Sequence, residues 1–305
     1  MPTTRKIDYI KKMKEGLQML GAIEAGGTKF VCAIATEDGT IIEKVQIPTE
    51  IPDTTIPKVL EFFQDQRISA LGIGSFGPLD VHPDSETYGF ITSTPKPGWI
   101  NFPFVKTMKE KLQVPVAFDT DVNAAVWGEF HAGAGKNLNS CLYITVGTGI
   151  GAGAVAERKL IHGWSHPEMG HISLRRHSDD HFPGVCPYHR DCLEGLAAGP
   201  AIEKRWGQKG DALPVDHPAW EMEAHYLAQA LMQYVLILSP EKIIMGGGVM
   251  KQRHLFPLIR SKVEQLAGNF LTLPAMDTFI VPPALKDDSG AMGAILMAQQ
   301  INSGN

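Results

Sequence analysis

Histidines and cysteines gather in one short stretch of the sequence, between residues 162 and 192. Six of the eleven histidines lie there, and Cys186, His189 and Cys192 follow one another at intervals of three. Thiolates and imidazoles in sets of four are the ligands of structural zinc in a tetrahedral site. The alternative is a polar loop whose histidines are merely exposed. We predict a closed Cys₂His₂ zinc site, which would hold down a loop too polar to pack by itself.

Glycine-rich segments follow two predicted strands, as EAGGTK at 24–29 and VGTGIGAG at 146–153. A turn without side chains lets backbone N–H groups converge on anionic oxygens, and the hydroxyls of Thr28 and Thr148 add donors. Either segment alone also fits a plain hairpin turn, and neither has the Gly-Lys-Ser/Thr of a Walker loop. Because the two loops stand in equivalent positions, we predict a clamp on the phosphates of a nucleotide. A third segment, MGGGVM at 245–250, follows a strand and opens a helix, where a nucleoside would lie against bare backbone.

Two carboxylates stand where a predicted strand meets a helix, in FDTDVNAAVWGE at 118–129. Asp121 is either the N-cap of that helix or a general base, and the two roles are compatible. A carboxylate at the tip of a strand is well placed to take the proton of a hydroxyl that attacks a γ-phosphate. Asp119 shares the strand face but lies further from the expected cleft.

The elements that must position these groups recur in the same order in both halves of the chain. The first half reads as a hairpin at 19–46, helices near 55–66 and 104–112, strands at 68–76 and 114–121, and a helix from about 122. Shifted by 121 residues, Ile23 and Gly26 fall on Ile144 and Gly147, and strands follow at 242–248 and 278–284. A helix with apolar residues at 3-and-4 spacing, from Trp220 to Leu238, precedes the first of these strands. We therefore predict two α/β domains with a cleft between them.

The expected boundaries follow from this repeat. They are an arm at 1–18, an N-terminal domain at 19–133, a C-terminal domain at 134–287 with the zinc loop at about 164–195, and a helix at about 288–305 that packs back on the N-terminal domain.

Composition excludes several classes of protein. The 305 residues are 44% apolar and 20% charged, which is typical of a globular protein with a sizeable core. Twenty-eight basic against 33 acidic residues give a net charge of −5 without a basic block, which argues against nucleic-acid binding. Four cysteines form no secreted framework and the N-terminus shows no signal segment, so we expect a cytoplasmic protein in which Cys32 and Cys141 are small buried strand residues. The uncharged stretch at 137–156 is rich in glycine and reads as strands and a loop, so we expect no membrane partner.

With these motifs assembled, the chain resembles the ROK family of sugar kinases, and most closely its bacterial fructokinase branch. The resemblance runs from Met19 to the C-terminus. It rests, in this order, on EAGGTK, TPKPGW at 94–99, DTDVNAA at 119–125, VGTGIGAG, HPEMGHISL at 166–174, CPYHRDCLEGLAAGPAI at 186–202 and IIMGGGVM at 243–250. It implies the duplicated actin-like, hexokinase-like α/β fold, a homodimer, and transfer of the ATP γ-phosphoryl group to O6 of D-fructose with Mg²⁺ on the nucleotide.

The resemblance also implies a role for individual residues. Asp121 matches the family's base. Glu168 and His171 of a Glu-x-Gly-His motif, with Glu194, match groups that hold sugar hydroxyls, a task that suits carboxylates. The implied sugar-binding residues are Gly77, Thr94, Lys96, Thr120, Asp121, Gly163, Glu168, His171 and Glu194. The implied nucleotide-binding residues are Gly26, Gly27, Thr28, Lys29, Gly147, Thr148, Gly149, Pro200, Gly246, Gly247 and Gly248. The implied zinc ligands are His171, Cys186, His189 and Cys192, which leaves His166, His177 and His181 on the solvent side.

Three positions depart from the family's usual pattern. Many relatives have Asp in place of Glu24, and the longer side chain would meet magnesium through a different water. The common Asn before the base is Thr120 here. His189 with Arg190 replaces a ligand loop rich in cysteine and glycine, which leaves room for a ligand set that differs at one position from that of many members.

The family also contains proteins with other functions, and these are the alternatives to a fructokinase. Its transcriptional repressors need a helix-turn-helix before the kinase-like body, for which the 18 residues before Met19 are too few. A non-catalytic sugar-sensing regulator would need neither Asp121 nor both glycine loops. Among kinases, glucose, mannose and N-acetylmannosamine are the rival substrates. Thr94, Lys96 and Thr120 lie where hydroxyl geometry would be read, and TPKPGW favours fructose by analogy.

Overall fold

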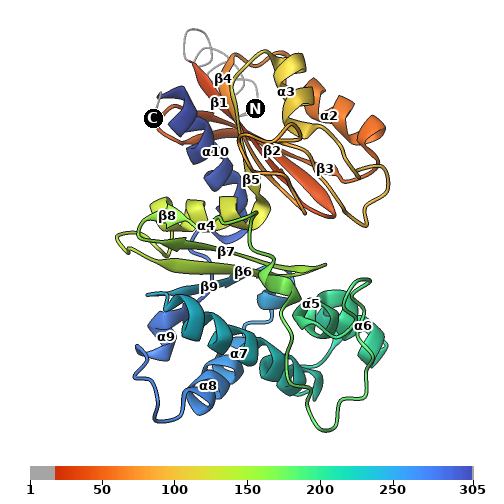
Figure 1. Cartoon of the computed structure of the whole chain (residues 1–305), viewed down its shortest axis with the longest axis vertical. Coiled ribbons are helices and arrows are strands. Elements are labelled where there is room, and N and C mark those ends of the chain that lie inside the picture. Colours follow the sequence, from red (N-terminus) through yellow and green to blue (C-terminus); the bar gives the residue numbers. More distant parts are fainter. Residues whose placement is uncertain (1–17, 304–305) are drawn as a thin grey trace, which may run out of the picture. The chain divides into compact units, whose positions relative to one another are not determined.

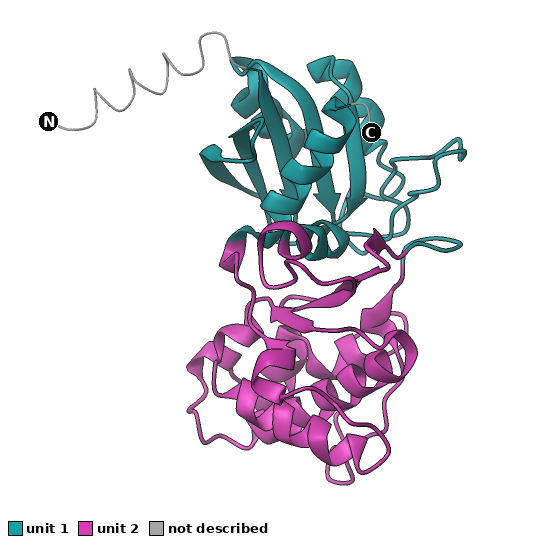
Figure 2. Ribbon diagram, turned by 90° about the vertical axis from the view of Figure 1, so that its left-hand side faces the viewer, with its two compact units in different colours: residues 1–128, 162–166, 288–305 teal, residues 129–161, 167–287 magenta. Residues whose placement is uncertain are grey.

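The structure, a computed structural model, describes residues 18–303. The described residues form two compact units (Figure 2). Unit 1 comprises 18–128, 162–166 and 288–303, and unit 2 comprises 129–161 and 167–287. Apart from Gln18, the arm expected at 1–18 lies outside the described residues. The boundary between residues 133 and 134 stays a prediction, since compactness alone does not define a part that folds by itself.

Unit 1 is built on a five-stranded sheet with the order β3-β2-β1-β4-β5. Its strands are β1 (Met19–Ala25), β2 (Lys29–Thr36), β3 (Ile41–Pro48), β4 (Ile68–Ser75) and β5 (Val116–Thr120). Strands β1, β2 and β3 are antiparallel neighbours, whereas β4 and β5 run parallel to β1. Strands β1 and β4 are almost wholly buried, as expected for apolar runs that are covered on both faces.

Helices cover this sheet (Figure 1). They are α2 (Pro52–Gln64), α3 (Phe104–Leu112), α10 (Ser289–Asn302), and the part of α4 (Asp121–Ala132) up to residue 128. Helix α2 begins three residues before the expected start, because Pro52 stands in its first turn, where a missing N–H costs nothing. Helix α10 packs against β1 and β4, and a Cβ on Gly72 would lie 1.8 Å from the carbonyl oxygen of Ala294. Only glycine permits this approach.

Aromatic side chains form the core on the α2–α3 side of unit 1. Trp99, Phe30 and Phe104 are fully buried, and the rings of Trp99 and Phe30 lie 5.4 Å apart. The indole N–H of Trp99 donates to the carbonyl of Glu50 (2.7 Å). This anchor fixes the end of the loop at 93–99, which contains the TPKPGW motif.

Unit 2 repeats the arrangement of unit 1, with the strand order β10-β9-β6-β7-β8. Its strands are β6 (Cys141–Val146), β7 (Ile150–Ala156), β8 (Lys159–Leu160), β9 (Ile243–Gly246) and β10 (Ile280–Val281). As in unit 1, the first three strands are antiparallel neighbours and the last two are parallel to the first. The predicted duplication of an α/β unit is therefore confirmed.

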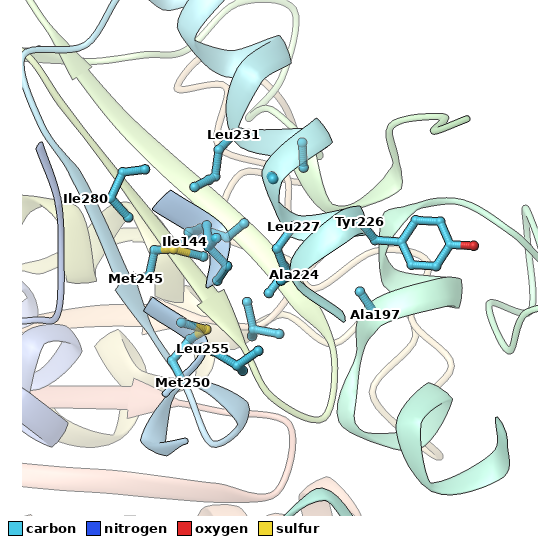
Figure 3. Packing of buried hydrophobic residues seen from close by; sticks show 14 of the residues in the cluster. Ile144, Ala197, Ala224, Tyr226, Leu227, Leu231, Met245, Met250, Leu255 and Ile280 are labelled. Carbon is cyan, nitrogen blue, oxygen red and sulfur yellow. The ribbon is translucent and has the colours of Figure 1, made fainter. Parts of the chain in front are cut away.

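The longest helix of unit 2 packs across its sheet (Figure 3). The helices are α5 (Leu193–Ala197), α6 (Gly199–Trp206), α7 (Ala219–Leu238), α8 (Leu255–Ala267) and α9 (Met276–Phe279). Short 3₁₀ turns occur at Met169–His171, Gly210–Ala212, Val249–Lys251 and Lys286–Asp288. Leu227 and Leu231 of α7 lie in one cluster with Ile144 of β6. The segment at 245–250 opens a 3₁₀ turn and not the expected α-helix, because its backbone hydrogen bonds span three residues before α8 begins at Leu255.

None of the helices between residues 18 and 303 combines the length and the apolar composition needed to span a bilayer.

Candidate active site and metal centre

The first glycine loop joins β1 to β2 in unit 1. The N–H of Gly26 donates to the carbonyl of Lys29 (3.0 Å), and the hydroxyl of Thr49 donates to the carbonyl of Gly26 (2.7 Å). The loop is thus held from its flanks, while Thr28 and Lys29 are exposed. Such a turn presents backbone to a ligand at little cost in reorganisation.

Asp121 is the first residue of α4, and Thr120 is the residue that caps the helix. The N–H of Asn123 donates to the hydroxyl oxygen of Thr120 (3.0 Å), which is the usual bond between a threonine N-cap and the third helical residue. The interpretation of Asp121 as N-cap is therefore wrong. Its Oδ1 accepts the adjacent N–H of Val122 (2.9 Å). Burial raises the pKa of Asp121 to about 6.

Glu24 forms a second buried carboxyl group close to Asp121. Burial, and then the charge of Asp121, raise the pKa of Glu24 to about 7. The carboxyl group lies against the first turn of α10, where a Cβ on Gly290 would lie 2.5 Å from its carbon, and the backbone N–H of Ala291 acts to lower its pKa. Its Oε2 is buried and has no hydrogen-bond partner among the described residues. A free carboxylate oxygen is the kind of ligand that Mg²⁺ takes, so Glu24 fits the implied magnesium.

Asp119 anchors a histidine that the sequence did not single out as a site residue. Asp119 is 5% exposed, and its Oδ1 accepts the amide N–H of Asn123 (2.8 Å) and the backbone N–H of Thr120 (2.7 Å). Its Oδ2 lies 2.8 Å from Nε2 of His162. The hydrogen bond to Asp119 raises the pKa of His162. The sequence offered one signal for this pair, namely the carboxylate of Asp119 two residues before the predicted base.

His166 is buried, and its expected place on the solvent side is wrong. It is 7% exposed, and its Nε2 accepts the N–H of Leu79 (2.9 Å). His162 and His166 therefore both attach the segment at 162–166 to the rest of unit 1. Between them, Gly163 has open space around its Cα. No feature of the sequence distinguished His166 from its exposed neighbours.

The loop at 93–99 brings Lys96 to the first glycine loop. A Cβ on Gly27 would lie 3.0 Å from Cε and 3.2 Å from Nζ of Lys96. Thr94 is buried, and its hydroxyl oxygen accepts the N–H of Lys96 (3.4 Å). Gly77 is half-buried in the turn that follows β4.

Three glycine segments meet at the carboxyl ends of β6 and β9 in unit 2. The N–H of Gly199 donates to the carbonyl of Gly147 (2.7 Å), and a Cβ on Gly147 would lie 3.6 Å from the nitrogen of Gly248. Helix α6 starts at Gly199 with Pro200 in its first turn, and no side chain caps it. Its first N–H groups are nevertheless already bonded within the fold, since Gly199 donates to Gly147, and Ala201 (2.8 Å) and Ile202 (3.1 Å) donate to the carbonyl of Ala198. The structure thus brings predicted nucleotide-binding residues from three parts of the sequence together.

Close packing explains two more of these glycines. Gly247 has φ +91°, and a Cβ there would lie 2.4 Å from the carbonyl oxygen of Val146. A Cβ on Gly246 would lie 2.2 Å from the hydroxyl of Tyr143. These two positions require glycine for the fold itself.

Glu194 lies against the second glycine loop. The N–H of Ile150 donates to Oε2 of Glu194 (3.0 Å), and a Cβ on Gly149 would lie 2.6 Å from the same oxygen. Gly149 is therefore needed for the approach of this carboxylate. Thr148, beside it, is exposed, and so is Glu168, whose carbonyl accepts the N–H of His171 (3.1 Å).

The four predicted zinc ligands form one cluster in unit 2. Their ligand atoms all lie within 4.8 Å of one another. Nδ1 of His171 is 3.4 Å from Sγ of Cys192 and 3.6 Å from Sγ of Cys186, and the latter sulfur is 3.8 Å from Nδ1 of His189. Ligand atoms on tetrahedral zinc are separated by about 3.3–3.8 Å, given bonds of about 2.0–2.3 Å. The cluster fits zinc.

A buried carboxylate also holds the zinc loop. Asp180 accepts the hydroxyl of Tyr226 (2.5 Å) on α7 and a guanidinium N–H of Arg205 (3.2 Å) on α6. This carboxylate gives the loop an anchor besides the predicted zinc, and the need of the loop for the metal stays a prediction. His177 is half-buried against His225, while His181 is exposed. Cys32 and Cys141 are fully buried strand residues, as predicted.

One protein family accounts for nearly the whole chain. The ROK family model matches residues 20–301. This chain belongs to the ROK family.

Relatives in the family have comparable length. A Bacillus subtilis (strain 168) protein is 54% identical over 92% of this chain and 96% of its own length. The fructokinase of Pediococcus pentosaceus is 46% identical over 92% of this chain and 98% of its own. The ROK hexokinase from Thermus thermophilus has a TM-score of 0.76 and 26% identity, and the match covers 94% of this chain and 100% of that one.

Two of the departures from the ROK pattern have a structural reason. Thr120 is suited to cap α4, which its hydroxyl does through Asn123. The longer side chain of Glu24 reaches the first turn of α10. At the third departure, His189 supplies a ring nitrogen to the cluster, so the ligand set retains four members.

Proposed function

We propose that this ROK protein is an ATP-dependent fructokinase that phosphorylates D-fructose at O6. The observation that carries the proposal is Asp121, a half-buried residue directly after the end of β5 whose carboxyl pKa is raised to about 6. A general base works best when its pKa lies near the working pH. The fructokinase name of the Pediococcus pentosaceus relative supports fructose over glucose, mannose and N-acetylmannosamine.

Asp121 takes the proton of the 6-hydroxyl as its oxygen attacks the γ-phosphorus of ATP. The new bond joins O6 to phosphorus, the bond to the ADP oxygen breaks, and the proton stays on the carboxyl group. Oδ2 of Asp121 is the accepting atom, because Oδ1 is already bonded to the N–H of Val122. Mg²⁺ near Glu24 would neutralise charge that develops on the phosphates.

Backbone N–H groups hold the nucleotide in this proposal. That of Gly27 serves one end of the phosphate chain, since the N–H of Gly26 already donates to the carbonyl of Lys29. The adjoining loops of Gly147 and Gly248 serve the remainder. Such groups bind anionic oxygens without a dedicated charged side chain.

The zinc cluster orients a sugar contact. His171 turns Nδ1 to the sulfurs, so Nε2 points away from the cluster and is left for a hydroxyl. Zinc, held by His171, Cys186, His189 and Cys192, would be a closed structural site. Glu168 and Glu194 supply the further acceptors for sugar hydroxyls.

The proposal includes a cytoplasmic location and a homodimer. The four cysteines are free thiols, and thiolate ligands need a reducing compartment. Sedimentation of the purified chain tests the homodimer.

A coupled assay of ADP release over fructose, glucose, mannose and N-acetylmannosamine tests the activity. We expect the highest kcat/KM with fructose and no turnover without Mg²⁺. Blank rates with every hexose would refute the kinase. Blank rates together with tight sugar binding would identify a sugar-sensing regulator.

A further inference from the structure

Lys96 belongs to the predicted sugar set, but its cationic side chain lies on the first predicted phosphate loop. A Cβ on Gly27 would lie 3.2 Å from its Nζ, so the ammonium rests against the backbone of the first glycine loop. Its own backbone is held on both sides. Buried Thr94 accepts its N–H, and the N–H of fully buried Trp99 donates to its carbonyl (3.2 Å).

The ammonium group of Lys96 forms no ion pair among the described residues of unit 1. Across residues 18–303 no acidic side chain pairs with its ammonium, and the side chain is half-buried. The neighbouring Lys29, by contrast, acts on the carboxylate of Glu24. Of the two lysines at the first glycine loop, Lys96 is therefore the one whose charge does not act on a neighbouring carboxylate.

An ammonium group with three donors and no acceptor matches anionic oxygens better than sugar hydroxyls, which both donate and accept. A positive charge held in place before the reaction stabilises the charge on a transferring phosphoryl group without reorganisation. The carboxyl groups of Glu24 and Asp121 make this counter-charge more necessary, because a triphosphate brings further negative charge beside them.

We propose that Lys96 binds the transferring γ-phosphoryl group and does not read the sugar. The inference rests on the proposed kinase activity and changes the role that the sequence had suggested for this residue. Lys96 then contacts ATP and the phosphorylated product, but neither ADP nor free fructose.

Lys96→Met and Lys96→Arg in the full chain test this, with Lys106→Met as control. Lys106 is a surface lysine of α3 whose loss removes the same charge. We expect kcat for Lys96→Met to fall by about 10²–10³-fold, as when one preorganised donor is lost, with partial recovery in Lys96→Arg. Calorimetric titration should show the wild type binding ATP more tightly than ADP, and Lys96→Met should lose that difference while fructose affinity is kept.

The outcomes separate the inference from the proposed function. Weaker fructose binding with unchanged kcat and unchanged ATP preference would overturn the inference and return Lys96 to the sugar site. If the wild type phosphorylates no hexose, the kinase proposal fails, and the ATP and ADP titrations still decide whether Lys96 meets the terminal phosphate. Lys96→Gln replaces Lys96→Met if thermal melting shows that the latter is unfolded.

Discussion

Nε2 of His162 lies 2.8 Å from Oδ2 of Asp119, two residues before the proposed base Asp121. The other carboxylate oxygen of Asp119 is taken by Asn123 and by the N–H of Thr120. Both oxygens of Asp119 are thus occupied, and the end of β5 is tied to α4 and to the segment at 162–166. A side chain 43 residues away therefore fixes the turn that carries Asp121.

This pair should make stability depend on pH. The bond to Asp119 raises the pKa of His162 in the folded state above its ordinary value of about 6.5. The stabilisation is then complete below about pH 6.5 and is lost as the pH rises through the higher folded-state pKa. As the pH is raised from about 6 to about 9, the free energy of unfolding in urea should therefore fall less in His162→Asn than in the wild type. Because the ring is 38% exposed, the difference should stay below ~1 kcal/mol.

His181→Asn is the matched control for that experiment, since His181 is exposed. It should keep the pH dependence of the wild type. Equal pH dependence in His162→Asn and the wild type would contradict a folded-state role for the pair.

Asp121→Asn should abolish proton removal but spare binding. We expect kcat to fall by at least ~10²-fold, while the dissociation constant for fructose changes little. Near-normal turnover would leave Asp121 without a catalytic role.

The raised pKa of Asp121 also predicts an acid limb in the wild-type profile. A base must be deprotonated to act, so kcat/KM should decline as the pH falls through about 6. Stopped assays across this range would show the limb. A profile that stays flat to a pH near the ordinary aspartate value of about 3.9 would argue against Asp121 as the group that titrates.

Purified protein should contain about one zinc per chain if the cluster of His171, Cys186, His189 and Cys192 forms a closed site. Cys186→Ser should lose the metal and weaken fructose binding, because His171 would lose its orientation. Cys32→Ala, at an equally buried cysteine in unit 1, should keep the metal. Elemental analysis decides, and active protein without metal would disprove the site.

Glu129 should be among the acidic residues most important for stability. Its fully buried carboxylate accepts the N–H groups of Ala134 (2.7 Å), Ala284 (3.1 Å) and Leu285 (2.9 Å). Glu129→Ala leaves these donors without partners and should reduce the free energy of unfolding by at least about 2 kcal/mol.

Glu241→Ala is its control. Glu241 also accepts two backbone N–H groups, from Asn139 (2.7 Å) and Ser140 (2.8 Å), but it is exposed, so water can replace it. Chemical denaturation should therefore show the smaller loss for Glu241→Ala. An equal loss in both variants would mean that burial is not the cause.

Local patterns were sufficient for the repeat of strands and for the zinc cluster. Apolar runs and glycine turns are properties of neighbouring residues, and Cys186, His189 and Cys192 are close in sequence. The contacts that were missed join distant segments. His166 accepts the N–H of Leu79, 87 residues away, and Lys96 reaches Gly27 from a different loop of unit 1.

The capping role of Thr120 was missed for a different reason. Asp and Thr are both good N-cap residues, and the sequence offers them side by side. Only the path of the backbone at the end of β5 decides which side chain reaches the N–H of Asn123. Because Thr120 caps the helix, Asp121 is not needed for that role.

The return of α10 to unit 1 has a consequence during synthesis. A ribosome delivers β1 and β4 long before α10, although Leu20, Ala22 and Ala70 share an apolar cluster with Ala294, Ile295 and Ala298. Until α10 emerges, that face of the nascent sheet has no helix to cover it and is open to chaperones or to aggregation. Unit 2, whose segments are contiguous but for residues 162–166, is translated in full before α10, the last helix that unit 1 needs.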